Sequence, residues 1–230
     1  MLLLVPSPLS QTSPSVPVLQ ADLPLIHRCT TWVVENAKPA RQAIKYLNMP
    51  LEIRALELLE IAKISEHQLE HLLKQATEQV PLALMSDAGC PAVADPGAKL
   101  VALAQQMGIP VRPLVGPNSI ILGLMGSGLN GQCFQFHGYP PVKPSQREGF
   151  LGNTEEQSRK EQCTQIAIET PFRNQVLLEA MLKTFNDNTR LCVASDLTGQ
   201  AEYLCTRTVS QWKKNTPSLA RQPTLFLWQA

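Results

Sequence analysis

A loop of small residues carries the densest set of chemically useful groups in this sequence. Residues 86–97 read Ser-Asp-Ala-Gly-Cys-Pro-Ala-Val-Ala-Asp-Pro-Gly and follow an apolar run at residues 81–85. Asp87 can accept hydrogen bonds, Gly89 lets a ligand approach the backbone closely, and the prolines stiffen the turn. A helical pattern at residues 98–107 follows directly. Open α/β sheets bind ligands where a strand, a tight loop and a helix follow one another in this way, so we predict a ligand site here.

A second Gly-Pro turn lies further along the chain. Residues 113–120 read Pro-Leu-Val-Gly-Pro-Asn-Ser-Ile and lead into a second helical pattern. Together the two segments resemble the signature loops of the tetrapyrrole-methylase-like S-adenosylmethionine (SAM) methyltransferases. Within that superfamily they most resemble the ribosomal RNA small-subunit methyltransferase I branch, which methylates a cytidine ribose 2′-oxygen and has a similar Pro-x-Pro-Gly-Pro turn. The resemblance covers nearly all of this chain.

The resemblance implies where the cofactor would bind. In the superfamily, SAM is held between two domains, largely by backbone groups and small side chains. In the first half, the implied cofactor-binding residues are Leu9, Ser86, Asp87, Gly89, Cys90, Pro91 and Val93. At the start of the second half they are Ser119 and Ile120. The superfamily usually has Thr or Asp where Cys90 stands, a change that a backbone contact would survive and a side-chain contact would not.

Matching segments occur in the second half. Residues 169–173, Glu-Thr-Pro-Phe-Arg, resemble the Tyr-Glu-Ser-Thr/Pro-x-Arg of the branch, and residues 196–198, Asp-Leu-Thr, resemble its Glu-Leu-Thr. Thr170, Leu197 and Thr224 are thereby implied as cofactor-wall residues. The alternative is that strand-end polar groups cap the following helices. For Arg173 the alternatives are a structural ion pair and a substrate contact.

The chain also departs from the superfamily pattern. The first loop is glycine-rich in relatives, whereas residues 6–10 here are Pro-Ser-Pro-Leu-Ser. The Glu-Asp-Thr-Arg of the branch becomes Glu-Asn-Ala-Lys at residues 35–38. A weak base would help to remove the proton of a ribose hydroxyl at or after methyl transfer, and we predict Glu35 and Lys38 for this catalytic role. The C-terminal helical extension of many branch members is also missing, so we expect a short form.

Composition limits the other functions. The formal net charge of the 230 residues is +1, far less basic than a protein that coats nucleic acid. The six cysteines show no C-x-x-C or metal-ligand spacing. We therefore predict that they are small buried hydrophobic residues, as in proteins of a reducing cytosol, and that they form no metal site. His67 and His71 are one helical turn apart, but we expect a solvated helix face. The apolar opening is too short for a signal peptide or a membrane span.

The patterns of apolar residues predict two α/β domains, residues 1–116 and 117–230. The resemblance implies that they form the tetrapyrrole methylase fold, with SAM in the cleft between them. The predicted strands are residues 2–5, 31–34, 56–61, 81–85, 109–113, 134–138, 163–169, 190–195, 201–207 and 223–228. The predicted helices are 38–47, 98–107, 120–127, 145–162, 171–185, 210–214 and one that Ser65 opens with a capping box to Gln68. We expect a break in the fourth of these helices near Gly152 and Asn153, and an apolar face on the fifth that includes Phe172 and Val176.

Three functional hypotheses remain open. The favoured one is a cytoplasmic, homodimeric SAM-dependent methyltransferase that acts on ribosomal RNA or the small ribosomal subunit, at a ribose 2′-oxygen, without a membrane. The second is a SAM methyltransferase of the same fold that acts on a tetrapyrrole or another small molecule. The third is a SAM-binding protein without transferase activity, which the altered first loop permits.

Overall fold

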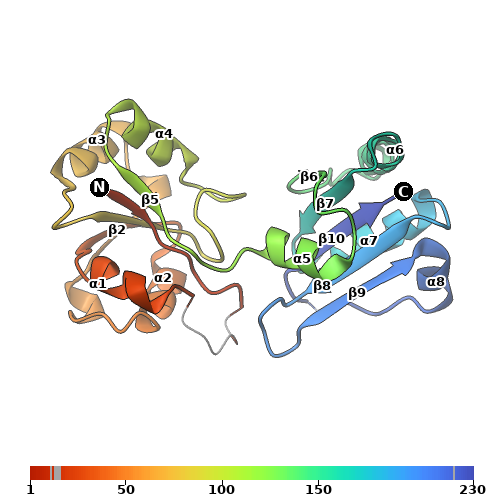
Figure 1. Cartoon of the computed structure of the whole chain (residues 1–230), viewed down its shortest axis with the longest axis horizontal. Helices are drawn as coiled ribbons and strands as arrows, with labels where there is room; N and C mark the ends of the chain where they lie inside the picture. The colour runs from red at the N-terminus through yellow and green to blue at the C-terminus, as the bar shows by residue number, and fades with distance from the viewer. Residues whose placement is uncertain (11, 13–16, 220) are drawn as a thin grey trace. The chain divides into compact units, whose positions relative to one another are not determined.

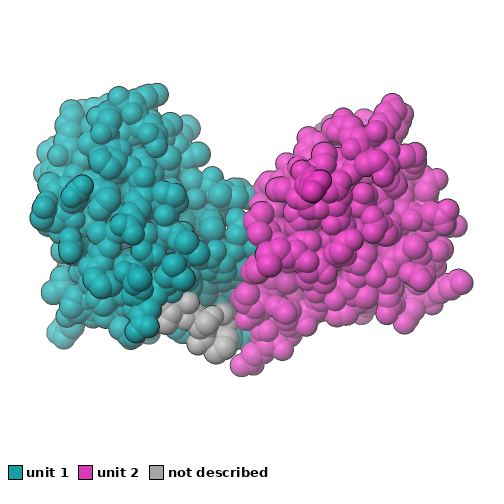
Figure 2. All heavy atoms as spheres, viewed as in Figure 1, with its two compact units in different colours: residues 1–118 teal, residues 119–230 magenta. Residues whose placement is uncertain are grey.

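The computed structural model describes residues 1–10, 12, 17–219 and 221–230. The chain divides into two compact units, Met1–Asn118 (unit 1) and Ser119–Ala230 (unit 2) (Figure 2). Each unit is an α/β structure built on one five-stranded sheet (Figure 1), which confirms the predicted fold class. Among the described residues, every helix is too short or too polar to cross a bilayer.

The sheet of unit 1 is entirely parallel. Its strand order is β3-β2-β4-β1-β5. The strands are β1 (Leu2–Leu4), β2 (Thr31–Val34), β3 (Glu57–Glu60), β4 (Leu82–Met85) and β5 (Val111–Pro113). The central strands β1 and β4 are apolar throughout because helices cover both faces of the sheet. Leu3 faces one core with Trp32 and Ile44, and Leu2 faces the other with Leu73.

Two pairs of helices form the covering layers of unit 1 (Figure 1). The helices α1 (Leu23–Ile26) and α2 (Ala37–Lys45) contribute to the first core, and α3 (Glu66–Gln75) and α4 (Ala98–Gln106) to the second. Short 3-10 turns lie at η1 (Gln20–Asp22), η2 (Ile53–Ala55) and η3 (Ile61–Lys63). The capping box predicted at the start of α3 is confirmed: the Ser65 hydroxyl accepts from the Gln68 amide, and the Gln68 side chain accepts from the Ser65 amide.

The sheet of unit 2 is mixed. Its order is β6-β7-β10-β8-β9, with β6 and β7 parallel and the other neighbours antiparallel. The strands are β6 (Phe134–Phe136), β7 (Thr164–Glu169), β8 (Arg190–Ser195), β9 (Tyr203–Thr208) and β10 (Thr224–Gln229). Because β10 runs antiparallel between β7 and β8, its first residue, Thr224, pairs with the last residue of each neighbour, Glu169 and Ser195. One edge of the sheet thus gathers three polar side chains.

The described residues of unit 2 form four helices: α5 (Ser119–Ser127), α6 (Pro144–Glu161), α7 (Asn174–Thr184) and α8 (Val209–Lys214). Three of them, α6, α7 and α8, share a core with Phe226 and Trp228 of β10. Helix α5 packs against β10 through Gly123, where an added Cβ would lie only 2.3 Å from the side chain of Leu225. Leu225 therefore faces α5, and the next residue of β10, Phe226, faces the core formed by the other helices, because side chains alternate between the two faces of a strand.

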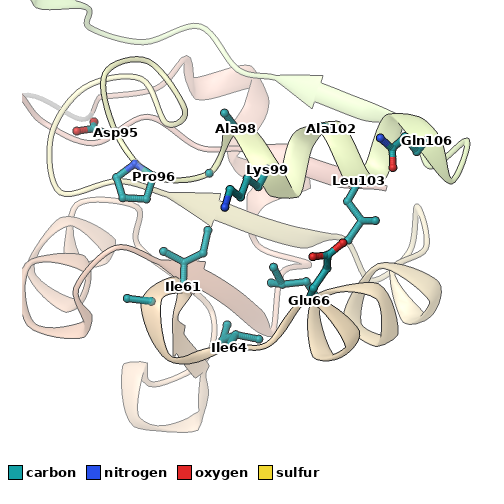
Figure 3. A pocket seen from close by; sticks show the side chains of 13 residues that line it. Ile61, Ile64, Glu66, Asp95, Pro96, Ala98, Lys99, Ala102, Leu103 and Gln106 are labelled. Atoms are coloured by element: carbon teal, nitrogen blue, oxygen red, sulfur yellow. The ribbon is translucent and has the colours of Figure 1, made fainter.

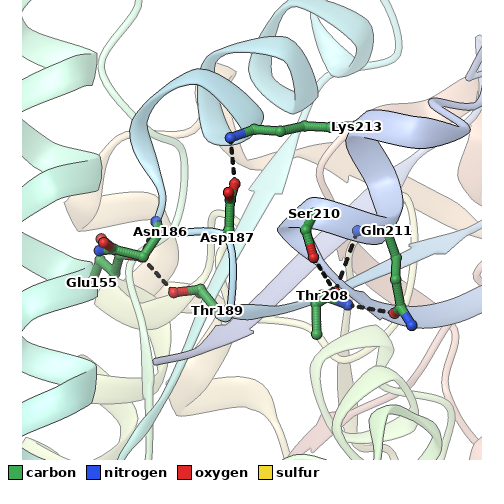
Figure 4. A network of polar contacts seen from close by, with 8 residues as sticks. All are labelled: Glu155, Asn186, Asp187, Thr189, Thr208, Ser210, Gln211 and Lys213. Carbon is green, nitrogen blue, oxygen red and sulfur yellow. Dashed lines mark hydrogen bonds and ion pairs between the residues drawn. The ribbon is translucent and has the colours of Figure 1, made fainter.

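A buried carboxylate ties α6 to the segment that precedes β8. Glu155 accepts hydrogen bonds from the Asn186 amide (2.7 Å), the Asn186 side chain (2.8 Å) and the Thr189 hydroxyl (Figure 4). A buried polar group is stable only when its hydrogen bonds are satisfied, and these three contacts fulfil that condition. We assign Glu155 a structural role.

Two details of the predicted helices of unit 2 are wrong. Helix α6 is continuous through Gly152 and Asn153, because the flanking Leu151 is buried and Thr154 donates to the carbonyls of the preceding turn. Helix α7 begins at Asn174 rather than at residue 171, so Phe172 lies in a turn before the helix and is exposed. Val176 is also exposed, which narrows the apolar face.

The continuity of α6 can be tested with Gly152→Ala. The added Cβ meets nothing within 4 Å, and glycine inside a helix costs about 0.5–1 kcal/mol relative to alanine. We expect the substitution to raise the free energy of unfolding by about that amount in urea denaturation. The matched control is Gly128→Ala, at a residue whose φ of +67° should make alanine destabilising. A loss of stability in Gly152→Ala would contradict a continuous helix.

Candidate active site

In unit 1, the first loop (residues 6–10) is bonded to the signature loop (residues 86–97). The amide of Ser7 donates to the Gly89 carbonyl (2.9 Å), and the amide of Gly89 donates back to the Ser7 carbonyl (3.1 Å). The buried Ser7 hydroxyl also donates to the Ser86 carbonyl (2.6 Å). A Cβ on Gly89 would lie 3.1 Å from the side chain of Leu9. Two predicted cofactor residues, Leu9 and Gly89, are therefore in close proximity.

The Gly-Pro turn (residues 116–118) packs against both loops. The thiol of Cys90 donates to the Pro117 carbonyl at 3.4 Å. A Cβ on Gly116 would lie 2.2 Å from the Cβ of Pro6 and 2.8 Å from the Pro17 carbonyl oxygen, closer than real atoms approach. Only glycine fits at residue 116. The three loops form one packed group, which we call the three-loop cluster, after the carboxyl ends of the parallel strands β1, β4 and β5.

The backbone of the signature loop is strained. Gly89 and Gly97 have φ values of +71° and +128°, and Ala92 and Ala94 also have positive φ, at +66° and +62°. A residue with a Cβ pays about 1–3 kcal/mol for such a conformation, and such strain concentrates at ligand sites. Pro91 between these residues is buried, whereas Val93 is exposed. The loop keeps a shape that its own local preferences disfavour.

Acidic side chains lie beside this loop. Glu35, after β2, accepts a hydrogen bond from the Asp87 amide (3.1 Å), and the Asn36 side chain donates to Asp87 Oδ2 (2.7 Å). The other carboxylate oxygen of Asp87, Oδ1, is buried and has no partner among the described residues. Lys38 is exposed on α2. Glu35 therefore holds the signature loop directly, and its predicted catalytic role with Lys38 stays a prediction.

Asp95 near the end of the signature loop has a raised pKa. Burial is the main cause, and the negative charges of Glu35 and Asp87 add to it, so that the pKa of Asp95 rises from 3.8 to about 6. A hydrogen bond with Ser86 acts in the opposite direction. This carboxyl group changes charge close to neutral pH. The sequence contains it within the signature loop, but nothing in the spacing distinguishes it from Asp87.

In unit 2, two of the polar residues at this strand edge, Thr224 and Ser195, form a chain of contacts with Asn174, the first residue of α7. The Asn174 side-chain amide donates to the Thr224 hydroxyl (2.9 Å), which lies 3.1 Å from the Ser195 hydroxyl. Asn174 is 1% exposed, yet its Oδ1 has no partner in the described part of the chain. Leu197, two residues after β8, is also buried. Asn174 and Ser195 belong to no recognisable sequence motif, so they were not among the predicted site residues.

The remaining predicted residues of unit 2 lie at the starts of helices and in turns. Ser119 and Ile120 open α5, where Ile120 is buried. Thr170 follows β7, and its amide donates to the buried Glu169 carboxylate at 2.7 Å. Arg173 donates to the same carboxylate oxygen twice, at 3.0 and 2.6 Å. The structure thus places Arg173 in an ion pair that fixes the turn between β7 and α7.

A separate pocket opens at the far end of the signature loop (Figure 3). Its volume is about 680 Å³, and within unit 1 it lies between the segment around η3 and α3 on one side and α4 on the other. Its lining is mainly apolar and consists of Ile61, Ala62, Ile64, Glu66, Leu69, Asp95, Pro96, Gly97, Ala98, Lys99, Ala102, Leu103 and Gln106. Asp95 lines this pocket and also lies near the acidic side chains of Glu35 and Asp87. Over the described ranges, no three His, Cys, Asp or Glu residues form a metal site.

Comparison with known proteins reveals sequence relatives. No protein-family model matches the chain. It is 28% identical over 197 residues to ribosomal RNA small subunit methyltransferase I of Vibrio cholerae. The matched region covers 86% of this chain and 65% of the relative. It is 33% identical over 166 residues to the protein of the same name in Halalkalibacterium halodurans, and this match covers 70% of this chain and 54% of the relative. The chain thus covers less than two thirds of either relative.

Solved structures with a similar fold are tetrapyrrole methylases. The methyltransferase CobJ has a TM-score of 0.59 at 16% identity, over 93% of this chain and 88% of its own. Uroporphyrin-III C-methyltransferase from Thermus thermophilus, complexed with S-adenyl homocysteine, has a TM-score of 0.54 at 16% identity, over 99% and 96%. At such identities the likeness shows a shared fold. The resemblance inferred from the two signature segments is confirmed.

The packing of the three-loop cluster can be tested with Gly116→Ala. Because the new Cβ would overlap Pro6, we expect a loss of about 1–3 kcal/mol in the free energy of unfolding, as for other overpacked sites. The control is Gly131→Ala, where an added Cβ meets nothing within 4 Å and φ is not positive. Equal stabilities of the two variants in thermal or urea unfolding would show that the loops are not closely packed.

The raised pKa of Asp95 predicts a pH-dependent effect of Asp95→Asn. Between pH 3.8 and about 6 the folded chain binds the proton more tightly than the unfolded chain, so the stability contributed by this group falls as pH rises through that window. The asparagine variant should gain stability relative to the parent from about pH 4 to about pH 6, by less than ~1 kcal/mol because the group is partly exposed to water. A difference between the two proteins that does not change with pH would contradict the shift.

Proposed function

We propose that this chain, a homologue of the ribosomal RNA small subunit methyltransferase I proteins with the fold of the tetrapyrrole methylases, is a SAM-dependent methyltransferase. The observation that carries the proposal is the three-loop cluster with the unpartnered Asp87 Oδ1 beside it. A buried acceptor without a donor costs free energy, which a bound ligand with a donor group would recover.

The residues present fit SAM. The cofactor carries an ammonium group, ribose hydroxyls and an adenine amine, all of which donate hydrogen bonds, and a positively charged sulfonium. Asp87 Oδ1 in unit 1 and Asn174 Oδ1 in unit 2 are buried acceptors that lack a donor within the described residues. Gly89 offers backbone without a side chain in the way. We propose that both groups of residues contribute to binding the cofactor.

When bound, SAM would supply a methyl group whose bond to a positively charged sulfur breaks as a nucleophilic oxygen, nitrogen or carbon attacks the methyl carbon, with the neutral thioether as the leaving group. The chain's own residues then have to position and desolvate the partners. Glu35 and Asn36 fix the orientation of Asp87. We propose Glu35 as the group that accepts a proton from a substrate hydroxyl, with Lys38 on the same segment to offset the charge.

The substrate that we propose is ribosomal RNA, methylated at a ribose 2′-oxygen. The relatives' names support RNA, and the net charge of +1 implies that a local surface rather than the whole protein binds it. The small ribosomal subunit is the corresponding partner. A cytoplasmic homodimer is the proposed state.

A tetrapyrrole or other small molecule is the second candidate substrate. It is favoured by solved structures of similar fold whose names include uroporphyrin-III and cobalt precorrin-4. Their identities of 14–16% are lower than the 28–33% of the RNA-modifying relatives, which is why we place RNA first. Loss of transferase activity with retained SAM binding is the third candidate, because the first loop has no glycine.

Cofactor binding is testable by calorimetric titration with SAM. We expect binding by the parent chain and an affinity weakened about tenfold or more in Asp87→Asn, since the amide would present a donor or lose the charge at Oδ1. The matched control is Asp187→Asn, which removes an exposed ion pair with Lys213 in unit 2 and should leave the affinity unchanged (Figure 4). Absence of any binding heat in the parent chain would contradict all three candidate functions.

The substrate class is testable with tritium-labelled SAM. We expect label to be transferred to small ribosomal subunits from a methylation-deficient strain and not to a porphyrin or corrinoid. Label in the tetrapyrrole alone would reverse the order of the first two candidates. SAM binding without transfer of label to either substrate would support the third candidate, a SAM-binding protein without transferase activity.

A further inference from the structure

The most exposed large hydrophobic side chain among the described residues is Phe172, at 78% exposure. It lies in the turn between β7 and α7, two residues after Thr170, and β7 ends at the edge where Glu169 pairs with Thr224. Covering this ring with a partner would be favourable, because it would remove apolar surface from water. Its place at the edge that carries the proposed cofactor residues of unit 2 directs attention to the substrate.

The turn that presents this ring is held rigidly. The Arg173 amide donates to the Thr170 carbonyl (3.0 Å), which closes a tight turn around residues 171 and 172. The side chain of Arg173 donates twice to the buried carboxylate of Glu169. The backbone that carries the ring is therefore held in place, and a partner that binds Phe172 has little to order besides the side chain itself.

A cation lies over the ring. The guanidinium carbon of Arg221 is 5.6 Å from the centre of the Phe172 ring. The segment around Arg221 is tied to α7 by two hydrogen bonds, from the Asn174 side chain to the Gln222 carbonyl (2.6 Å) and from the Leu219 amide to the Gln175 side chain (3.0 Å). Across the described part of the chain, no carboxylate forms an ion pair with Arg221, so its charge remains available.

We propose that Phe172 and Arg221 bind one unpaired nucleotide of the RNA substrate, a role that rests on the proposed function. The base would stack on the exposed ring, and the guanidinium would contact the adjoining phosphate. Proteins hold single-stranded RNA through this combination of aromatic rings and cations. A protein partner fits less well, because the exposed apolar surface here is one ring with Val176 one helical turn away, and not a broad patch.

The test is binding of a fluorescent single-stranded RNA oligonucleotide to the full chain, with SAM affinity measured in parallel by calorimetry. We expect Phe172→Ala to weaken RNA binding about tenfold or more, Phe172→Trp to retain it, and both to bind SAM as the parent does. The matched control is Val176→Ala, another exposed apolar residue near the turn, which should bind RNA normally. An oligonucleotide with abasic sites should bind the parent and Phe172→Ala equally.

Arg221→Gln gives an independent readout. Loss of one phosphate contact should reduce the slope of log affinity against log salt by about one unit, whereas Phe172→Ala should leave that slope unchanged.

The outcomes separate the two proposals. Unchanged RNA binding in Phe172→Ala, or an equal loss in Val176→Ala, would overturn the nucleotide site alone. A change of oligomeric state in Phe172→Ala with normal RNA binding would also overturn it, and would indicate a protein interface. A parent chain that binds SAM but no RNA would overturn both this site and the RNA substrate, whereas a parent chain that binds no SAM would overturn the proposed function itself.

Discussion

The close packing of the three-loop cluster in unit 1 is the constraint on which the rest of the site depends. Strand β1 lies between β4 and β5, so the loops that follow these parallel strands emerge at one edge and must share space. They do so because Ser7 and Gly89 pair through their backbones and because Gly116 leaves room for Pro6. The positive φ values of Ala92 and Ala94 are a cost that this packing has to offset. A strained loop with a fixed shape is suited to bind a ligand through its backbone.

Electrostatics adds a second constraint at the same edge. Glu35, Asp87 and Asp95 place three carboxyl groups close enough to interact. Burial is the main cause of the raised pKa of Asp95, and the negative charges of Glu35 and Asp87 add to it. One oxygen of Asp87 lacks a donor, and so does the side-chain oxygen of the buried Asn174 in unit 2. A ligand that carries a positive charge and hydrogen-bond donors would satisfy the free oxygen of Asp87, as we propose for SAM. The glycine-free first loop does not prevent this, because Ser7 supplies the backbone pairing that joins it to the signature loop.

Much of this structure could be predicted from the sequence, and the limits have physical causes. The strands of unit 1 and the helices at Ser65 and at residues 98–107 were evident from periodicity and capping, which depend on local sequence. The continuity of α6 was not, since burial of Leu151 overrides the local preference of Gly152. The exposure of Phe172 depends on the Glu169–Arg173 pair, which the spacing suggested only as an alternative. Asn174 and Ser195 both contact Thr224 because β10 lies between β7 and β8, a long-range pairing that no sequence motif indicates.

The most direct test of the central claim is a crystal structure of this chain grown with excess SAM or its demethylated product. We predict ligand density against the backbone of Gly89 and Cys90, with a donor group of the ligand on Asp87 Oδ1 and the three loops as described. Ligand bound in the pocket between α3 and α4 instead, or no ligand with the signature loop filled by its own side chains, would contradict the claim.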